Sequence, residues 1–300
     1  MAITGLPPAT DADLSRVTES FQMLAPRWSV WVLMTLSSGP LRYAEIGRQL
    51  SWLHDGQLHP RLSRLSGAGL VERTAYSPRH VVYGLTDRGT HMLPVLKTIA
   101  DWGDEYLEKR LVTNRRTGET EPERIPPARN IEDALTLLTP RHATTILWTL
   151  KTRDTCSARG LAGVTIPAST WTNIYPPLRQ LVDDALVEAT EGPVPVYQLS
   201  PSGKGLAPVF CSVSAWAAGR PLAEASTHPV WGQMPVPSQA VPGVWATHQS
   251  RQSAPPSTAP PTPALTARQA PATWQGGDLF SHQIPSRPLA PAPASGGRGR

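Results

Sequence analysis

Residues 57–64 carry polar side chains whose types and spacing suit recognition of an anionic surface that also offers hydrogen bonds. These side chains are Gln57, His59, Arg61 and Arg64. Arginine can donate two parallel hydrogen bonds to a guanine edge or a phosphate, and glutamine and histidine can bond to base edges. Because Arg61 and Arg64 are three residues apart, a helix would place both on one face. Solvation of a helix surface is the simpler alternative for an isolated arginine pair, so the neighbouring elements decide the interpretation.

The surrounding segment, residues 39–83, predicts two short helices followed by a β-hairpin. Apolar residues at helical spacing mark a first helix from about residue 41 and a second one after a turn at residues 51–56. The second helix has an inward face made of Leu58, Leu62 and Leu65. Gly67 and Gly69 end this helix, and alternating residues on either side of a tip at 75–80 predict two strands. This order of elements is a winged helix-turn-helix, and the second helix is its recognition helix.

The hairpin tip and the first helix add further candidate contacts to a nucleic acid. Tyr76, Arg79 and His80 at the tip suit phosphate or minor-groove contact. Arg42 and Arg48, expected on the first helix, could hold the phosphate backbone, and plain solubility explains them equally well. Pro60 lies within the predicted recognition helix, which is unusual unless that position belongs to the first turn of the helix, where proline is tolerated.

A later segment of the chain, within residues 131–220, repeats the pattern of the first. Three groups of residues recur, at offsets of 114, then 116, then 114. They are Pro26-Arg27 and Leu33 with Pro140-Arg141 and Leu147, then Leu62 and Leu65 with Leu178 and Leu181, then Tyr83, Gly89 and Trp102 with Tyr197, Gly203 and Trp216. A lengthened turn and a shortened wing explain the shift and its return, so the chain is predicted to be a tandem duplication.

The two repeats differ in charge. Residues 61–80 hold four arginines against one glutamate, a net charge of +3, whereas residues 177–194 hold one arginine against four carboxylates, a net charge of −3. Since neutralisation of phosphate charge dominates non-specific DNA affinity, we expect that the second repeat no longer recognises DNA. It would serve for packing, as an internal pseudo-dimer partner or a docking surface. Trp171, Asn173 and Tyr175 could contact a protein or ligand there, or belong to the second core.

Composition separates a folded part from a tail. Residues 221–300 hold 15 of the 33 prolines and almost no leucine or isoleucine, which predicts disorder. The tail tryptophans Trp231, Trp245 and Trp274 are either short partner-binding motifs or tolerated residues. We expect a loose leader at 1–12, a winged-helix domain at 13–112, a linker at 113–130, a degenerate second winged-helix domain at 131–220 and the disordered tail at 221–300. The predicted fold class is mainly α with small β-wings.

Charge, cysteine content and motifs narrow the functional class. The net charge of +5 is modest, and two cysteines, Cys156 and Cys211, make neither a disulfide framework nor a zinc site. Membrane-span and signal-peptide patterns are absent from the sequence, so a cytoplasmic, nucleoid-associated location is expected. Phosphate loops, paired carboxylates, a nucleophile elbow and metal-ligand spacing are absent too. The sequence therefore predicts no enzyme, no catalytic residue, no cofactor and no metal.

The first repeat resembles a known family over about residues 20–110. The residues that carry the resemblance are Arg27-Trp28, Gly39-Pro40-Leu41-Arg42-Tyr43, Glu45-Ile46, Leu58, Arg61-Leu62, Leu65, Gly69-Leu70-Val71, Arg73, Tyr76, Pro78, Val81, Tyr83, Leu85-Thr86, Gly89, Leu93-Pro94-Val95 and Trp102-Gly103. They are similar to those of the HxlR-type winged helix-turn-helix transcriptional regulators of bacteria. The resemblance implies a DNA-binding domain that dimerises through terminal helices and places one recognition helix per half-site in the major groove. Many relatives carry a cysteine just before the first core helix, and some use it for redox or electrophile sensing. Residues 21–25 contain no cysteine, so thiol sensing by the first repeat is not expected unless Cys156 or Cys211 has taken over that role.

The sequence thus predicts a sequence-specific DNA-binding transcriptional regulator whose partner is double-stranded DNA. It would pair as a homodimer or as an intramolecular pseudo-dimer through terminal helices, and its tail could recruit proteins. Two alternatives are a protein-interaction module that uses both repeats as docking platforms, and an enzyme that uses the winged helix only to dimerise. Weak DNA affinity without steep salt dependence would mark the docking module, and the absence of any cofactor-binding domain argues against the enzyme.

Overall fold

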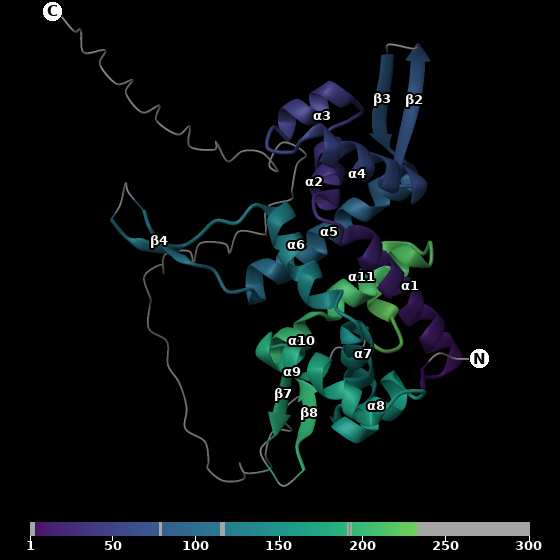
Figure 1. The fold of residues 1–300 in the computed structure, drawn as a ribbon, viewed down its shortest axis with the longest axis vertical. Helices are drawn as coiled ribbons and strands as arrows, with labels where there is room; N and C mark the ends of the chain where they lie inside the picture. The colour runs from purple at the N-terminus through teal and green to yellow at the C-terminus, as the bar shows by residue number, and fades with distance from the viewer. Residues whose placement is uncertain (1–3, 78–79, 115–117, 191, 193, 233–300) are drawn as a thin grey trace, which may run out of the picture. The chain divides into compact units, whose positions relative to one another are not determined.

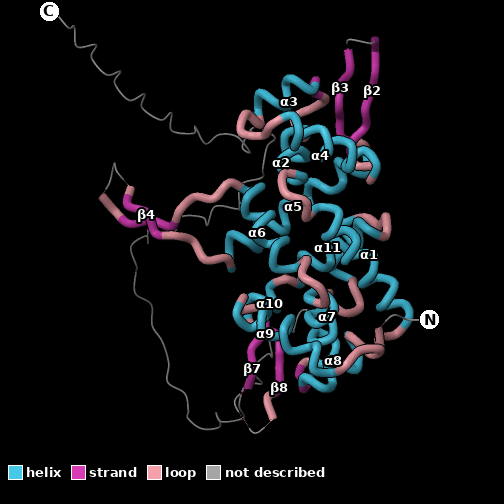
Figure 2. Tube along the Cα trace, in the orientation of Figure 1, coloured by secondary structure: helices cyan, strands magenta, loops and turns pink. Residues whose placement is uncertain are grey.

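The computed structural model describes residues 4–77, 80–114, 118–190, 192 and 194–232 (Figure 1). Helices dominate these residues, and the strands form small antiparallel sheets (Figure 2). Most of the tail expected to be disordered, including Trp245 and Trp274, lies outside the described residues. None of the described helices is long and apolar enough to cross a bilayer.

The first half of the chain folds in the order helix, helix, strand, helix, helix, hairpin, helix. Its elements are α1 (Pro8–Leu24), α2 (Ser29–Leu36), β1 (Leu41–Arg42), α3 (Tyr43–Gln49), α4 (Asp55–Gly67), β2 (Val71–Ser77), β3 (His80–Leu85) and α5 (Asp87–Tyr106). The strands β2 and β3 form the wing, which projects beyond α4 in Figure 1. The predicted winged helix-turn-helix is confirmed in this half.

Strand β1 pairs with the wing strand β3, and Gly89 in α5 packs closely against the backbone at the start of the wing. The sheet order is β1-β3-β2, with Leu41 opposite Tyr83 and Val71 opposite Leu85. Helix α5 then begins against the end of α4. Thr86 N donates to Leu70 O (3.0 Å), and a Cβ on Gly89 would collide with that same carbonyl oxygen. Glycine is therefore required where α5 passes the start of the wing.

The second half repeats the order of these elements. It contains α6 (Pro127–Leu138), α7 (Ala143–Arg153), β6 (Thr155–Ser157), α8 (Ala158–Thr165), η1 (Trp171–Ile174), α9 (Tyr175–Asp183), β7 (Val187–Thr190), β8 (Val196–Leu199), α10 (Pro201–Gly205), α11 (Ala207–Ala217) and η2 (Leu222–Thr227). Its sheet order is β6-β8-β7. Between the halves, β4 (Leu111–Thr113) and β5 (Thr120–Pro122) pair as a hairpin. The predicted linker at 113–130 therefore overlaps the last residue of β4 and includes all of β5 and the first residues of α6.

Local hydrogen bonds recur at matched positions of the two halves. Ser200 N donates to Leu186 O (3.1 Å), just as Thr86 N donates to Leu70 O, and a Cβ on Gly203 would collide with Leu186 O. The residues that precede α2 and α7, Trp28 and His142, both have left-handed backbones, with φ of 75° and 71°. The two halves therefore share these local backbone features as well as the order of their elements.

The long helices of the two halves contact each other reciprocally. Helix α5 packs on α11, α1 packs on α11, and α6 packs on α5. Trp102 Nε1 donates to Ser202 O (3.1 Å), and Trp216 Nε1 donates to Arg88 O (3.1 Å). Trp216 and Ser202 lie 114 residues after Trp102 and Arg88, respectively. Each half therefore offers the same donor and the same acceptor to the other, which is the pattern of a two-fold interface.

Helical and buried residues begin before the predicted start of the first domain and continue past the predicted end of the second. The expected leader at 1–12 is partly helical, since α1 begins at Pro8, where proline is preorganised for a helix N-terminus, and Leu6 is buried. At the other end, η2 and the residues up to Gly232 pack on the second half. Trp231 is 1% exposed and stacks on Phe210 with ring centroids 4.2 Å apart. The prediction that Trp231 lacks a core is wrong, because residues distant in sequence supply that core.

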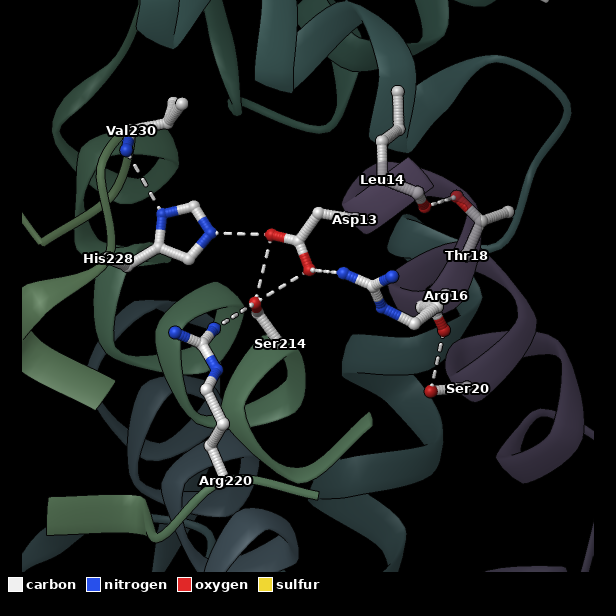
Figure 3. A network of polar contacts seen from close by, with 9 residues as sticks. All are labelled: Asp13, Leu14, Arg16, Thr18, Ser20, Ser214, Arg220, His228 and Val230. Atoms are coloured by element: carbon white, nitrogen blue, oxygen red, sulfur yellow. Dashed lines mark hydrogen bonds and ion pairs between the residues drawn. The ribbon is translucent and has the colours of Figure 1, made fainter. Parts of the chain in front are cut away.

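A buried polar network holds this C-terminal segment against α1 and α11 (Figure 3). His228 Nε2 donates to Asp13 Oδ2 (2.8 Å), while His228 Nδ1 accepts from the backbone of Val230 (3.1 Å) and Trp231 (2.9 Å). Two accepted bonds on Nδ1 fix the neutral tautomer with its proton on Nε2. Ser214 Oγ also donates to Asp13. Burial acts to raise the pKa of Asp13, but the hydrogen bonds from His228 and Ser214 outweigh it, and the net shift is downward.

Candidate nucleic-acid interface

Helix α4 exposes a polar face because its apolar residues all turn inward. Its three leucines are almost completely buried, and the helix packs on α2. Gln57, His59 and Arg64 are exposed. At the start of the helix, Gln57 Oε1 accepts a hydrogen bond from His54 N (3.4 Å). The surface of α4 that points away from the core therefore combines an amide, an imidazole and a guanidinium.

Arg61 has a structural contact that the sequence does not reveal. It is half-buried, and its Nε donates to Arg27 O (2.7 Å) in the turn before α2. The contact spans 34 residues, so no local spacing signals it. It ties α4 to the first core helix, and substitution of Arg61 will therefore affect the position of α4 as well as any ligand contact.

Pro60 lies deeper in α4 than the first turn where proline is usually tolerated. The helix begins at Asp55, so Pro60 follows the first turn and leaves the Gly56 carbonyl without its usual amide partner. Gly56 is exposed, and water can satisfy its carbonyl. Access to solvent lowers the cost of the missing hydrogen bond in α4.

The wing brings three of the predicted contact residues together. Tyr76 is 70% exposed, and its ring centroid lies 5.3 Å from that of His80. Arg42 Nη2 lies 3.5 Å from His80 Nε2. Arg42 is in β1 rather than on the first helix, where it was predicted, because the chain pairs with β3 at Arg42 and Val82 before α3 begins. Arg79 lies outside the described residues.

The corresponding surface of the second half has different chemistry. Trp171 in η1 and Tyr175 in α9 are 43% and 39% exposed, and their rings meet edge-on at 5.7 Å. Arg179 is followed by Asp183 and Asp184. Burial, and then the nearby charge of Asp183, raise the pKa of Asp184. At the offset of 116, Pro177 and Gln180 stand where the first half carries Arg61 and Arg64, and the surface of η1 and α9 combines exposed aromatic rings with the carboxylate of Asp183.

The geometry of α3, α4 and the β2–β3 wing defines a winged helix-turn-helix protein. Residues 23–111 match the model of the HxlR-like helix-turn-helix family. The chain is 33% identical over 98 residues to a protein of Methanothermobacter thermautotrophicus named as an uncharacterized HTH-type transcriptional regulator, covering 32% of this chain and 75% of that protein. It is 30% identical over 95 residues to the HTH-type transcriptional regulator YodB of Bacillus subtilis, covering 31% of this chain and 85% of YodB.

The chain belongs to the HxlR-like helix-turn-helix family, as its residues 27–103 predict. The solved structure of the reduced form of the B. subtilis regulator YodB is 27% identical, covers 34% of this chain and 96% of that one, and superposes with a TM-score of 0.29. The assignment rests on the sequence matches. The family match lies in the first half of the chain.

Proposed function

We propose that this protein is a sequence-specific DNA-binding transcriptional regulator whose first half reads the DNA. Helix α4 would enter the major groove, with Gln57, His59 and Arg64 facing base edges. The observation that carries this proposal is the exposed polar face of α4 beside a wing whose Arg42, Tyr76 and His80 lie together. Arg79, next to His80 in sequence, would add a phosphate or minor-groove contact. Promoter occupancy would then block or recruit polymerase.

We further propose that the second half is a degenerate winged-helix domain that no longer reads DNA. The repeated element order, the matching sheet order and the bonds at Leu70 and Leu186 support a common fold. Its acidic residues would repel phosphates. The two domains would span about α1 to α5 and α6 to α11.

The reciprocal contacts between the halves favour an intramolecular pseudo-dimer. The paired tryptophan bonds, from Trp102 and Trp216, join α5 to α11 in the way that two copies of one helix pair in a symmetric dimer. A chain that pairs its own terminal helices in this way already covers the surface through which two chains would dimerise. We therefore expect one polypeptide, with one DNA-reading helix, per binding site.

Operator binding by the full-length chain tests the proposal. Genomic fragments selected by the protein give an operator, and fluorescence anisotropy at several salt concentrations gives its affinity and salt slope. Arg64→Gln is expected to weaken specific binding by about 1–3 kcal/mol if it contacts a base, with the salt slope of non-specific binding nearly unchanged. Arg129→Gln is the matched control, since Arg129 is exposed on α6, outside the proposed interface. Equal operator affinity for Arg64→Gln, Gln57→Ala and the wild-type chain would refute the assignment of α4.

Two measurements separate the remaining alternatives. Light scattering is expected to give a particle mass near that of one chain, 32.4 kDa; a dimer mass would refute the pseudo-dimer. The exposed aromatic pair Trp171 and Tyr175 favours a second function, docking of a protein partner on the second half. A chain that only docks proteins should bind DNA weakly and lose little affinity as salt rises, whereas phosphate contacts produce a steep loss.

A further inference from the structure

A cavity of about 750 Å³ lies where the start of α5 meets the end of α11. Arg88 and His91 line it from α5, and Trp216, Arg220 and Leu222 line it from the end of α11 and the chain that follows. Its volume is within the range of small-molecule sites, about 300–1,000 Å³. Its walls combine apolar carbon, including the Trp216 ring, with two guanidinium groups.

The two arginines of this cavity have no direct carboxylate partner among the described residues. The Arg88 guanidinium lies over the Trp216 ring, 4.6 Å from its centroid. Arg220 Nη2 donates to Ser214 Oγ (3.4 Å), and Ser214 donates to Asp13, which His228 and Arg16 also contact (Figure 3). The lining residues that the structure describes include no aspartate or glutamate.

The matching place on the other side of the pseudo-dimer is filled by the protein. There, Tyr106 corresponds to Arg220, and Gly205 corresponds to His91, at the offset of 114. The Tyr106 ring lies so close to Gly205 that an added Cβ would be 2.5 Å from it, and this ring stacks with Trp102 at 5.9 Å. One side of the pseudo-dimer thus holds an aromatic ring of its own beside its tryptophan. The other side is open and carries arginines.

We propose that the open cavity binds a small aromatic carboxylate. The aromatic body would occupy space comparable to that filled by Tyr106 on the other side, against Trp216 and Leu222, and the carboxylate would accept hydrogen bonds from Arg88 and Arg220. Arginine suits this role because its planar fork matches a carboxylate. This site is distinct from the α4 surface, so its existence does not depend on DNA binding.

Isothermal titration of the full-length chain with 2-naphthoate tests this site, and the neutral 2-naphthamide serves as the matched ligand. Naphthoate is expected to bind saturably, at least about tenfold more tightly than the amide, because charge-assisted hydrogen bonds are worth more than about 1.4 kcal/mol. Arg220→Gln and Arg88→Gln should each lower the affinity for naphthoate by about tenfold or more. Arg129→Gln, which removes the same charge elsewhere, should bind like the wild-type chain.

A second variant tests the location directly. His91→Gly combined with Arg220→Tyr copies the Tyr106–Gly205 arrangement and should fill the cavity, abolishing naphthoate binding while thermal unfolding remains cooperative. Arg220 is exposed, so its substitution reports on binding even if Arg88→Gln disturbs the stacking on Trp216. Equal affinity for acid and amide, wild-type affinity in Arg220→Gln, or no saturable heat up to about 1 mM naphthoate would each overturn the proposal.

Discussion

Replacement of Trp231 by alanine is expected to destabilise the second half of the protein strongly. The Trp231 side chain is 1% exposed, it stacks on Phe210 with centroids 4.2 Å apart, and it meets Trp148 edge-on at 5.9 Å. Truncation of a buried aromatic residue to alanine costs about 3–5 kcal/mol. It also removes the anchor that holds residues 221–232 against α11, including the His228 bond to Asp13 (2.8 Å). The cost should therefore fall in the upper part of that range.

Urea unfolding followed by near-ultraviolet circular dichroism measures this effect, with Trp171→Ala as the matched control. Trp171 is 43% exposed, and the same chemical change there should alter the free energy of unfolding by less than about 1 kcal/mol. The two halves can unfold separately, so the comparison uses the transition that Trp231→Ala shifts. A loss below about 1 kcal/mol for Trp231→Ala, similar to that of the control, would refute the placement of Trp231 in the core.

Three further predictions concern the network, the wing junction and the pairing of the halves. Because the pKa of Asp13 is lowered from 3.8 in the folded chain, its contribution to stability is complete above pH 3.8 and is lost as pH falls through its folded pKa; the difference in unfolding free energy between wild type and Asp13→Asn should shrink in that acidic range in urea titrations. Gly89→Ala should lower the melting temperature, since its Cβ collides with a backbone carbonyl, whereas Gly67→Ala, with open space around it, should leave it unchanged or raise it slightly. Trp102→Phe should cost about 1–3 kcal/mol in urea unfolding, because Ser202 O loses its donor; no change would contradict the reciprocal pairing.

The first winged helix could be predicted closely because its signals are local. The inward leucines of α4 and the alternating residues of β2 and β3 gave the correct elements, and the polar face of α4 follows from the same periodicity. Arg42 was placed on the wrong element, since two residues of strand pairing decide that position and carry no periodicity. The α4 anchor on Arg27 O was missed because it joins residues far apart in sequence.

The sequence by itself determined the family and the helix–helix–hairpin order of residues 39–85, because these depend on residue types at short spacings. Only the tertiary structure decided which residues of the two halves contact each other. It paired Trp102 with Ser202 and Trp216 with Arg88, and it placed Trp231 in a core. It also left an open cavity lined by Arg88, Trp216 and Arg220, whereas the Tyr106 ring lies against Gly205 at the position 114 residues earlier than Arg220. Such contacts depend on how helices distant in sequence pack together, and no local pattern of residue types encodes that packing.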